Sequence, residues 1–237
     1  MRVLSFAITD IGLKRKINQD SYLIDDAAQL YVVADGMGGH LGGEVASQHA
    51  VKSIQRHCKE NKHLNPRERL NHGVLRSSNE IFISSREKPE LSGMGTTVLA
   101  LLIEDKTAYI AQVGDSRAYL LQGSNIWQVT EDHSLLNEEI RAGRISRQDA
   151  PNYQFKNVIT RSVGYESDVE VDIYRRELQK GDQILMCSDG LSGPVDSKDF
   201  LLMIEKYGPE AGLKHLVRLA NERGGDDNIT AVLCQVI

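Results

Sequence analysis

The sequence predicts an α+β fold in which antiparallel β-sheets form the inner layers and helices cover them. Strand-like and helix-like segments do not alternate one for one, and helices come in consecutive pairs. The strands between residues 97 and 129 follow one another closely, as in an antiparallel meander. These observations favour stacked layers over a doubly wound parallel sheet. The 237 residues, 41% hydrophobic and 26% charged, suit one globular domain over 1–237.

The predicted strands are short apolar runs, many of them rich in β-branched or aromatic residues and ended by Gly, Asp or Asn. Their spacing places several of them within a turn of the next one. In chain order they are Val3–Thr9, Leu30–Ala34, Thr97–Ile103, Ala108–Val113, Ala118–Leu121, Val169–Ile173, Gln183–Cys187 and Ile229–Val236.

Three helices are predicted from apolar residues that recur every three or four positions. Glu44–Cys58 carries such a stripe. Pro66–Ser85 carries another, behind a proline that suits the first turn of a helix. The third, Pro209–Arg223, is ended by the pair Gly224–Gly225.

Charge and cysteine content narrow the class of protein. The net charge of -5 predicts no general attraction to nucleic acid or to anionic lipid. Cys58, Cys187 and Cys234 include no CxxC pair, which indicates free thiols and a reducing compartment. The N-terminus does not resemble a signal peptide, and no apolar run approaches the ~20 residues of a membrane span. We therefore expect a cytoplasmic protein without membrane contact.

Four aspartates stand at the ends of predicted core strands. Asp35, Asp115 and Asp189 each end an apolar run, and Asp227 shortly precedes the last run. One such residue is usually a turn former, but four could converge in a packed core. Clustered carboxylates repel one another unless a cation neutralises them, and oxygen ligands suit Mg²⁺ or Mn²⁺ better than Zn²⁺. The pattern predicts a divalent metal site and says little about its substrate.

Two further segments could meet an ion or an anion. The glycine-rich stretch 35–43 could bring the backbone close to a ligand, or it could be a flexible connection. It matches neither a P-loop nor a GxGxxG motif. Arg15 stands five residues before Asp20, and its guanidinium fork matches phosphate oxygens. A solvated basic loop is the alternative interpretation of this Lys-Arg-Lys run.

Nine short motifs follow one another from residue 12 to residue 230, within a region that spans residues 8 to 236. They are Gly12–Asp20, Val33–Gly39, Met94–Thr97, Val113–Tyr119, Glu131–Ser134, Asn157–Arg161, Gly181–Asp182, Cys187–Leu191 and Gly225–Thr230. In this order they resemble the metal-dependent protein phosphatases of type 2C in their compact bacterial form. Each motif is weak alone, and the ordered set is specific.

The resemblance implies a four-layer α-β-β-α sandwich of two antiparallel sheets flanked by helix pairs. It also implies a centre for two Mn²⁺ or Mg²⁺ ions, held by Asp35, the carbonyl of Gly36, Asp189 and Asp227. Asp115, together with Asp189, matches a third and weaker metal position.

Further roles follow from the same resemblance. Arg15 would bind the substrate phosphate, Asp20 would act through metal-bound water, and Asn228 would position Asp227. A mobile flap would span residues 134–156 beside the metal site. Water activated by the ions would attack phosphorus directly, without a phospho-enzyme.

One position departs from the pattern of many eukaryotic relatives, which have His two residues after the first metal Asp. Here that residue is Met37, as is usual in the bacterial form. His40 could protonate the leaving oxygen of serine or threonine, or it could be an exposed loop histidine. A cysteine mechanism is disfavoured, because no Cys has an Arg six residues later.

The implied activity is hydrolysis of phosphoserine and phosphothreonine in proteins, opposing a bacterial Ser/Thr kinase. The expected partners are phosphorylated proteins and that kinase, and the chain is expected to be a monomer. Three alternatives remain: a pseudophosphatase that only binds phosphoproteins, a regulator with a single partner, and a metal-dependent phosphodiesterase or nuclease. The presence of all the acids and Arg15 counts against the first, and the net charge counts against the last.

Overall fold

The strands and helices of this computed structural model are described over residues 1–237, apart from the side chains of residues 39–41 and 151. The strands are β1 (Val3–Asp10), β2 (Asp20–Asp25), β3 (Leu30–Met37), β4 (Gly95–Thr96), β5 (Val98–Glu104), β6 (Thr107–Val113), β7 (Arg117–Gln122), β8 (Asn125–Gln128), β9 (Asp172–Glu177), β10 (Gln183–Cys187) and β11 (Ile229–Val236). The helices are α1 (Gly39–Glu60), α2 (Pro66–Glu87), α3 (Leu135–Arg141), α4 (Asp189–Ser192), α5 (Ser197–Tyr207) and α6 (Pro209–Glu222), with short 3₁₀ turns at Pro89–Leu91 and Ala150–Asn152.

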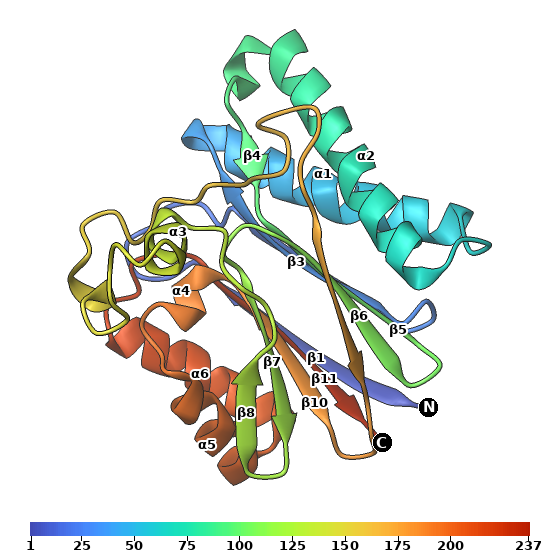
Figure 1. Cartoon of the computed structure of the whole chain (residues 1–237), viewed down its shortest axis with the longest axis vertical. Helices are drawn as coiled ribbons and strands as arrows, with labels where there is room; N and C mark the ends of the chain where they lie inside the picture. Colours follow the sequence, from blue (N-terminus) through green and yellow to red (C-terminus); the bar gives the residue numbers. More distant parts are fainter.

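The strands form two antiparallel sheets that face each other (Figure 1). One has the order β1-β11-β10-β7-β8, and the other has the order β2-β3-β5-β6-β9 with β4 paired to β3. The helices α1 and α2 cover the outer face of the second sheet, and α5 and α6 cover the outer face of the first (Figure 1). The predicted four-layer α-β-β-α sandwich is confirmed.

Three apolar clusters fill the three spaces between the layers. Because side chains alternate along a strand, each strand serves two of these spaces. In β3, Val32 belongs to the cluster under α1 and α2, whereas Val33 belongs to the cluster between the sheets. In β11, Val232 lies between the sheets, and Leu233 faces α5 and α6.

The predicted elements are found with three kinds of error. The helix predicted from Glu44 begins at Gly39, and the strand predicted over Val169–Ile173 lies further along, as β9. The strands β2, β4 and β8 and the helices α4 and α5 were not predicted, and α3 lies within the segment 134–156 that was predicted to be a flap. In α5 the apolar residues do not fall on one helix face, because Phe200 and Ile204 are buried while Leu202 is half exposed.

All three cysteines are free and buried, as the sequence predicts. Within the described part of the chain, no helix has the length and apolar character that a bilayer span requires.

Candidate active site

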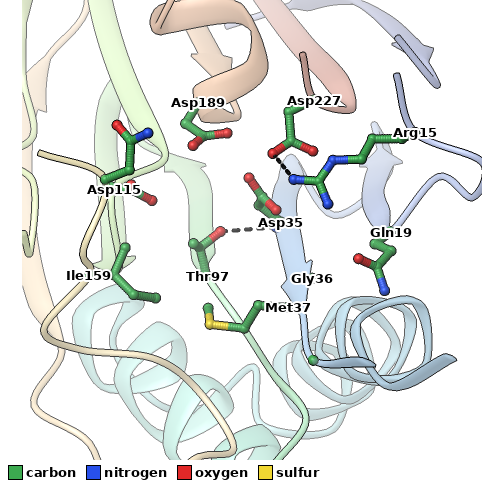
Figure 2. A pocket seen from close by; sticks show the side chains of 12 residues that line it. Arg15, Gln19, Asp35, Gly36, Met37, Thr97, Asp115, Ile159, Asp189 and Asp227 are labelled. Atoms are coloured by element: carbon green, nitrogen blue, oxygen red, sulfur yellow. Dashed lines mark hydrogen bonds and ion pairs between the residues drawn. The ribbon is translucent and has the colours of Figure 1, made fainter. Parts of the chain in front are cut away.

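Side chains from the ends of four strands line one pocket of about 330 Å³ (Figure 2). Asp35 lies in β3 of the six-stranded sheet, and Asp115 lies in the connection from β6 of that sheet to β7 of the other. Asp189 begins α4 directly after β10 and Asp227 precedes β11, so both come from the five-stranded sheet. Arg15 lines the same pocket. The fold therefore brings together the acids that are widely separated in the sequence.

Two threonines hold the backbone of Asp35. Its N–H donates to Thr97 Oγ1 at 2.9 Å, and its carbonyl accepts from Thr96 Oγ1 at 2.9 Å and from the N–H of Thr97 at 2.8 Å. Thr97 Oγ1 also lies 2.8 Å from Oγ of Ser116, the residue after Asp115. These contacts fix Asp35 relative to Asp115. The sequence assigned the threonines no role, because their contacts arise only when the strands pair.

Asp20 lies behind the pocket wall. It pairs with Asp35 across the β2–β3 ladder, and it is 8% exposed. Its Oδ2 accepts a hydrogen bond from Ser188 Oγ at 2.8 Å, whereas its Oδ1 has no hydrogen-bond partner among the described atoms. Ser188 immediately precedes Asp189, so this contact joins the two sheets just below the carboxylates.

Asp227 has partners for both of its carboxylate oxygens. Arg15 Nη2 donates to Oδ2 at 2.6 Å, and the N–H of Asn228 donates to Oδ1 at 2.8 Å (Figure 2). The Asn228 side chain accepts from the N–H of Gln19 at 2.8 Å and donates to the carbonyl of Ile11 at 2.9 Å. Asn228 thereby fastens the loop that carries Arg15 to the beginning of β11.

Gly36 lies where two backbone segments touch. A Cβ at this position would be 2.0 Å from the carbonyl oxygen of Gly43 and 2.6 Å from that of Gln19, so no side chain fits. Gly43 belongs to α1, and the glycine-rich stretch thus lets the helix approach the end of β3 closely. His40 lies outside the residues whose side chains the structure describes, and its role stays a prediction.

The crowded carboxylates resist ionisation. Loss of contact with water raises the pKa of Asp20 and of Asp115 to about 7, and for Asp115 the charge of Asp189 adds to the effect. Burial and the neighbouring Asp20 and Asp189 raise the pKa of Asp35 well above its usual range. Burial and Asp227 raise that of Asp189. Such a cluster is costly in its charged form unless a cation is close by.

The donor set fits hard divalent ions. It consists of carboxylate and carbonyl oxygens, and Asp20 Oδ1 and Asp189 Oδ1 are buried without hydrogen-bond partners among the described atoms. In the arrangement described here, however, no three Asp, Glu, His or Cys side chains are placed to hold an ion. The Asp227 carboxylate is turned toward Arg15, so ion binding requires its carboxylate, and others, to rotate from the positions described.

His133 connects Gly114, the residue before Asp115, to Thr160 and to Asp172 at the start of β9. Its ring is buried, its Nδ1 accepts from the N–H of Gly114 at 3.1 Å, and its own N–H donates to the Gly114 carbonyl at 3.0 Å. Its carbonyl accepts from the N–H of Thr160 at 2.8 Å, and Nε2 lies 3.2 Å from Oδ2 of Asp172. Burial lowers the pKa of His133, consistent with a neutral ring that donates from Nε2.

The predicted flap, residues 134–156, begins and ends near the pocket. Ser134 caps α3 and forms an isolated bridge with Ile159, which lines the pocket. Leu136 and Lys156 line an adjoining hollow whose wall also includes Asp115 and Asp189. The two ends of this segment therefore lie beside the acids, and its role as a flap stays a prediction.

Comparison with known proteins places this geometry in a family. The family model of protein phosphatase 2C matches residues 14–233. The serine/threonine phosphatase stp of Listeria welshimeri is 38% identical in an alignment of 237 positions that covers 96% of this chain and 93% of the relative. The crystal structure of the serine/threonine phosphatase PstP/Ppp of Mycobacterium tuberculosis matches with a TM-score of 0.93 at 32% identity, covering 100% of this chain and 99% of the other.

A further similar structure is described with bound metal. It is the catalytic domain of the serine/threonine protein phosphatase PstP in complex with two manganese ions. It matches with a TM-score of 0.89 at 32% identity, covering 99% of this chain and 98% of the other.

Proposed function

The chain belongs to the protein phosphatase 2C family, and from this premise we propose that its acidic pocket hydrolyses phosphoserine and phosphothreonine in proteins phosphorylated by a Ser/Thr kinase. It is a metal-dependent protein serine/threonine phosphatase. The observation that carries the proposal is the convergence of Asp35, Asp115, Asp189 and Asp227 on one pocket that also contains Arg15.

In this proposal, Asp35, the Gly36 carbonyl, Asp189 and Asp227 hold two divalent ions. Mn²⁺ is the first candidate, because a similar phosphatase is described with two manganese ions, and Mg²⁺ suits the same oxygen ligands. Asp115 with Asp189 would hold a third ion. Divalent ions at such a site acidify water and offset the negative charge of the phosphoryl oxygens.

The residues of the chain position the substrate and the ligands. Arg15 is half exposed at the pocket, and its guanidinium can release Asp227 and donate to two phosphate oxygens. Asn228 keeps the Arg15 loop at the pocket through its contact with Gln19. Asp20 orients water from behind Asp35, where its free Oδ1 is available as an acceptor.

The source of the proton for the leaving group is also part of the proposal. His40 is the candidate that the sequence offers, and solvent is the alternative donor. The His40→Gln variant distinguishes them: a loss of the alkaline limb in the pH profile of kcat, where a general acid is deprotonated, supports His40, and an unchanged profile supports solvent.

The cellular setting that we propose is the cytoplasm, with a monomeric enzyme that opposes a Ser/Thr kinase. The whole chain 1–237 is proposed to form one catalytic domain in which residues 134–156 act as a mobile flap over the pocket. The position of Leu136 and Lys156 beside Asp115 and Asp189 supports such a role.

The test is manganese-dependent release of phosphate from a phosphothreonine peptide. We expect Asp189→Ala to lower kcat at least ~10³-fold, since it removes a charge that would hold the ions. Asp226→Ala is the matched control, because its carboxylate is exposed and pairs with Lys14 outside the pocket. Wild-type turnover that is unaffected by Mn²⁺ or by Asp189→Ala would refute the metal assignment, and binding of the peptide without turnover would favour a pseudophosphatase.

A further inference from the structure

A second groove opens directly from the acidic pocket. Its volume is about 460 Å³, and it shares Met37 and Ile159 with the pocket. These two side chains lie on the side of the pocket away from Arg15 (Figure 2). Beyond them the groove, which we call the side groove, runs along Arg161, Tyr165, Glu166 and Asp168. A peptide whose phosphate occupies the pocket can therefore extend its chain past Met37 and Ile159 into the side groove.

The charges of the side groove are predominantly negative. Its one arginine, Arg161, pairs with Glu170 at 2.8 Å and with Asp172 at 3.2 Å, so its charge is already neutralised. Glu166 and Asp168 are exposed in the groove, and no ion pair joins either of them to another described residue. The side groove thus offers two carboxylates that lack a cationic partner.

The wall also offers an apolar surface for the stem of a long side chain. Tyr165 is 68% exposed, and Val169 is partly buried beside it in the same groove. Lys and Arg side chains commonly lay their methylene stems along apolar surface while the charged end reaches a carboxylate. An aromatic face next to two carboxylates is suited to such a side chain.

The opposite side of the pocket has the opposite charge. Arg15 lies there between Lys14 and Lys16 in the sequence, and all three are exposed. Lys14 pairs with Asp226 and Arg15 with Asp227, whereas no ion pair joins Lys16 to another described residue. A phosphopeptide that crosses the pocket therefore meets basic residues on one side and acidic residues on the other. This asymmetry favours phosphopeptides whose basic residues lie on the side-groove side of the phosphorylated residue over peptides whose basic residues lie on the Arg15 side.

We propose that the side groove binds the basic flank of a phosphoprotein substrate, namely a Lys or Arg near the phosphorylated residue in the sequence. The inference rests on the proposed phosphatase function and deepens it by naming a substrate class. Glu166 and Asp168 are the specificity-determining residues, Tyr165 supports the stem of the bound side chain, and neither carboxylate takes part in the hydrolysis itself.

The experiment compares three phosphothreonine peptides that differ only in flanking charge. One has Lys on the N-terminal side of the phosphothreonine, one has Lys on the C-terminal side, and one has Gln at both places. We expect one of the two Lys peptides to exceed the Gln peptide in kcat/KM by roughly three- to tenfold at low salt, through KM, and the advantage to shrink at high salt. The double variant Glu166→Gln, Asp168→Asn should remove that advantage.

Two controls separate the groove from general electrostatics. The double variant Glu177→Gln, Glu205→Gln removes two exposed acids on β9 and α5, outside the groove, and should keep the preference. Hydrolysis of p-nitrophenyl phosphate, which has no flanking residues, should be the same in all variants. Failure to hydrolyse this compound and the Gln peptide would overturn the phosphatase proposal.

Two outcomes would overturn the groove inference alone. One is equal kcat/KM for all three peptides by an enzyme that hydrolyses p-nitrophenyl phosphate normally. The other is a preference for Lys that survives in the Glu166→Gln, Asp168→Asn variant or disappears equally in the Glu177→Gln, Glu205→Gln control.

Discussion

His133 is a single residue through which three parts of the chain meet beside the acids. It contacts both backbone polar groups of Gly114, the residue before Asp115, and its carbonyl is bound by Thr160. Its Nε2 also contacts Asp172, the first residue of β9. Because the ring is buried, losing any of these partners leaves polar groups unpaired. The position of Asp115 therefore depends on a side chain that lies outside the pocket.

We expect His133→Ala to lower the free energy of unfolding by about 2–3 kcal/mol and to raise the Mn²⁺ concentration needed for half-maximal activity. His133→Asn should keep more of the metal response than His133→Gln, because Asn Oδ1 can occupy the place of Nδ1 and accept from Gly114. Urea unfolding and a Mn²⁺ titration of activity measure the two effects. Equal metal responses in the Asn and Gln variants would show that the Gly114 contact does not position Asp115.

At the scale of single residues, the sequence predicted the pocket aspartates but not the hydrogen bonds that hold them in place. An aspartate at the end of an apolar run is visible in the sequence, since the run and the acid are adjacent. The contacts of Thr97 with Asp35 and of Ser188 with Asp20 join residues 62 and 168 positions apart. Such contacts depend on which strands pair, and spacing alone does not encode them.

The helices α1 and α2 are joined at their polar faces by a network around Glu80. Its carboxylate accepts hydrogen bonds from Ser53 Oγ at 2.7 Å, Arg76 Nε at 2.9 Å and Arg56 Nη2 at 2.8 Å. Partial burial opposes ionisation of Glu80, but the hydrogen bonds outweigh it and lower its pKa to about 2. The network spans the outer helical layer above the six-stranded sheet.

Glu80→Gln is expected to lower the free energy of unfolding by about 1–2 kcal/mol at pH 7, after allowance for solvent screening. The folded pKa of about 2 lies below the usual 4.5, so the contribution is complete above pH 4.5 and is lost as pH falls toward 2. The difference between wild type and variant should therefore narrow below pH 4.5. Denaturant unfolding of both proteins across pH 7 to 3 checks this, and a constant difference would contradict it.

The predicted elements were those with long or purely apolar patterns, such as Pro66–Ser85 and Ile229–Val236. The missed ones have mixed patterns for physical reasons. The strand β2 begins and ends with aspartate, and β8 is a short outer strand whose Trp127 is half exposed. Their place in a sheet comes from the neighbouring strand, which single-segment patterns do not contain.

Both sheets contribute to the four pocket aspartates. Asp35 lies in the six-stranded sheet, Asp189 and Asp227 adjoin strands of the five-stranded sheet, and Asp115 lies in the β6–β7 connection that joins the two sheets. Ions held between them would therefore connect the two inner layers as well as serve the reaction. The resemblance predicted this four-layer arrangement, whereas the apolar runs alone predicted only the presence of inner strands and outer helices.

Mn²⁺ is expected to stabilise the whole fold. At an ion concentration 100 times the dissociation constant the gain is about 2.7 kcal/mol, which corresponds to a rise of roughly 5–10 °C in Tm. Calorimetry with Mn²⁺ and with EDTA measures it. Asp189→Asn should abolish most of the rise and Asp226→Asn should keep it. A rise that is the same in both variants would mean that the ion acts elsewhere on the protein.

The position of β11 in its sheet has a consequence for how the protein is made. β11 lies between β1 and β10, yet it follows every other described strand in the sequence. During translation, β1 is synthesised long before β11, its partner in the sheet. Asp227 is synthesised just before β11. The pocket is thus completed only once β11 has been made, and a nascent chain that still lacks this strand cannot remove phosphate from a protein.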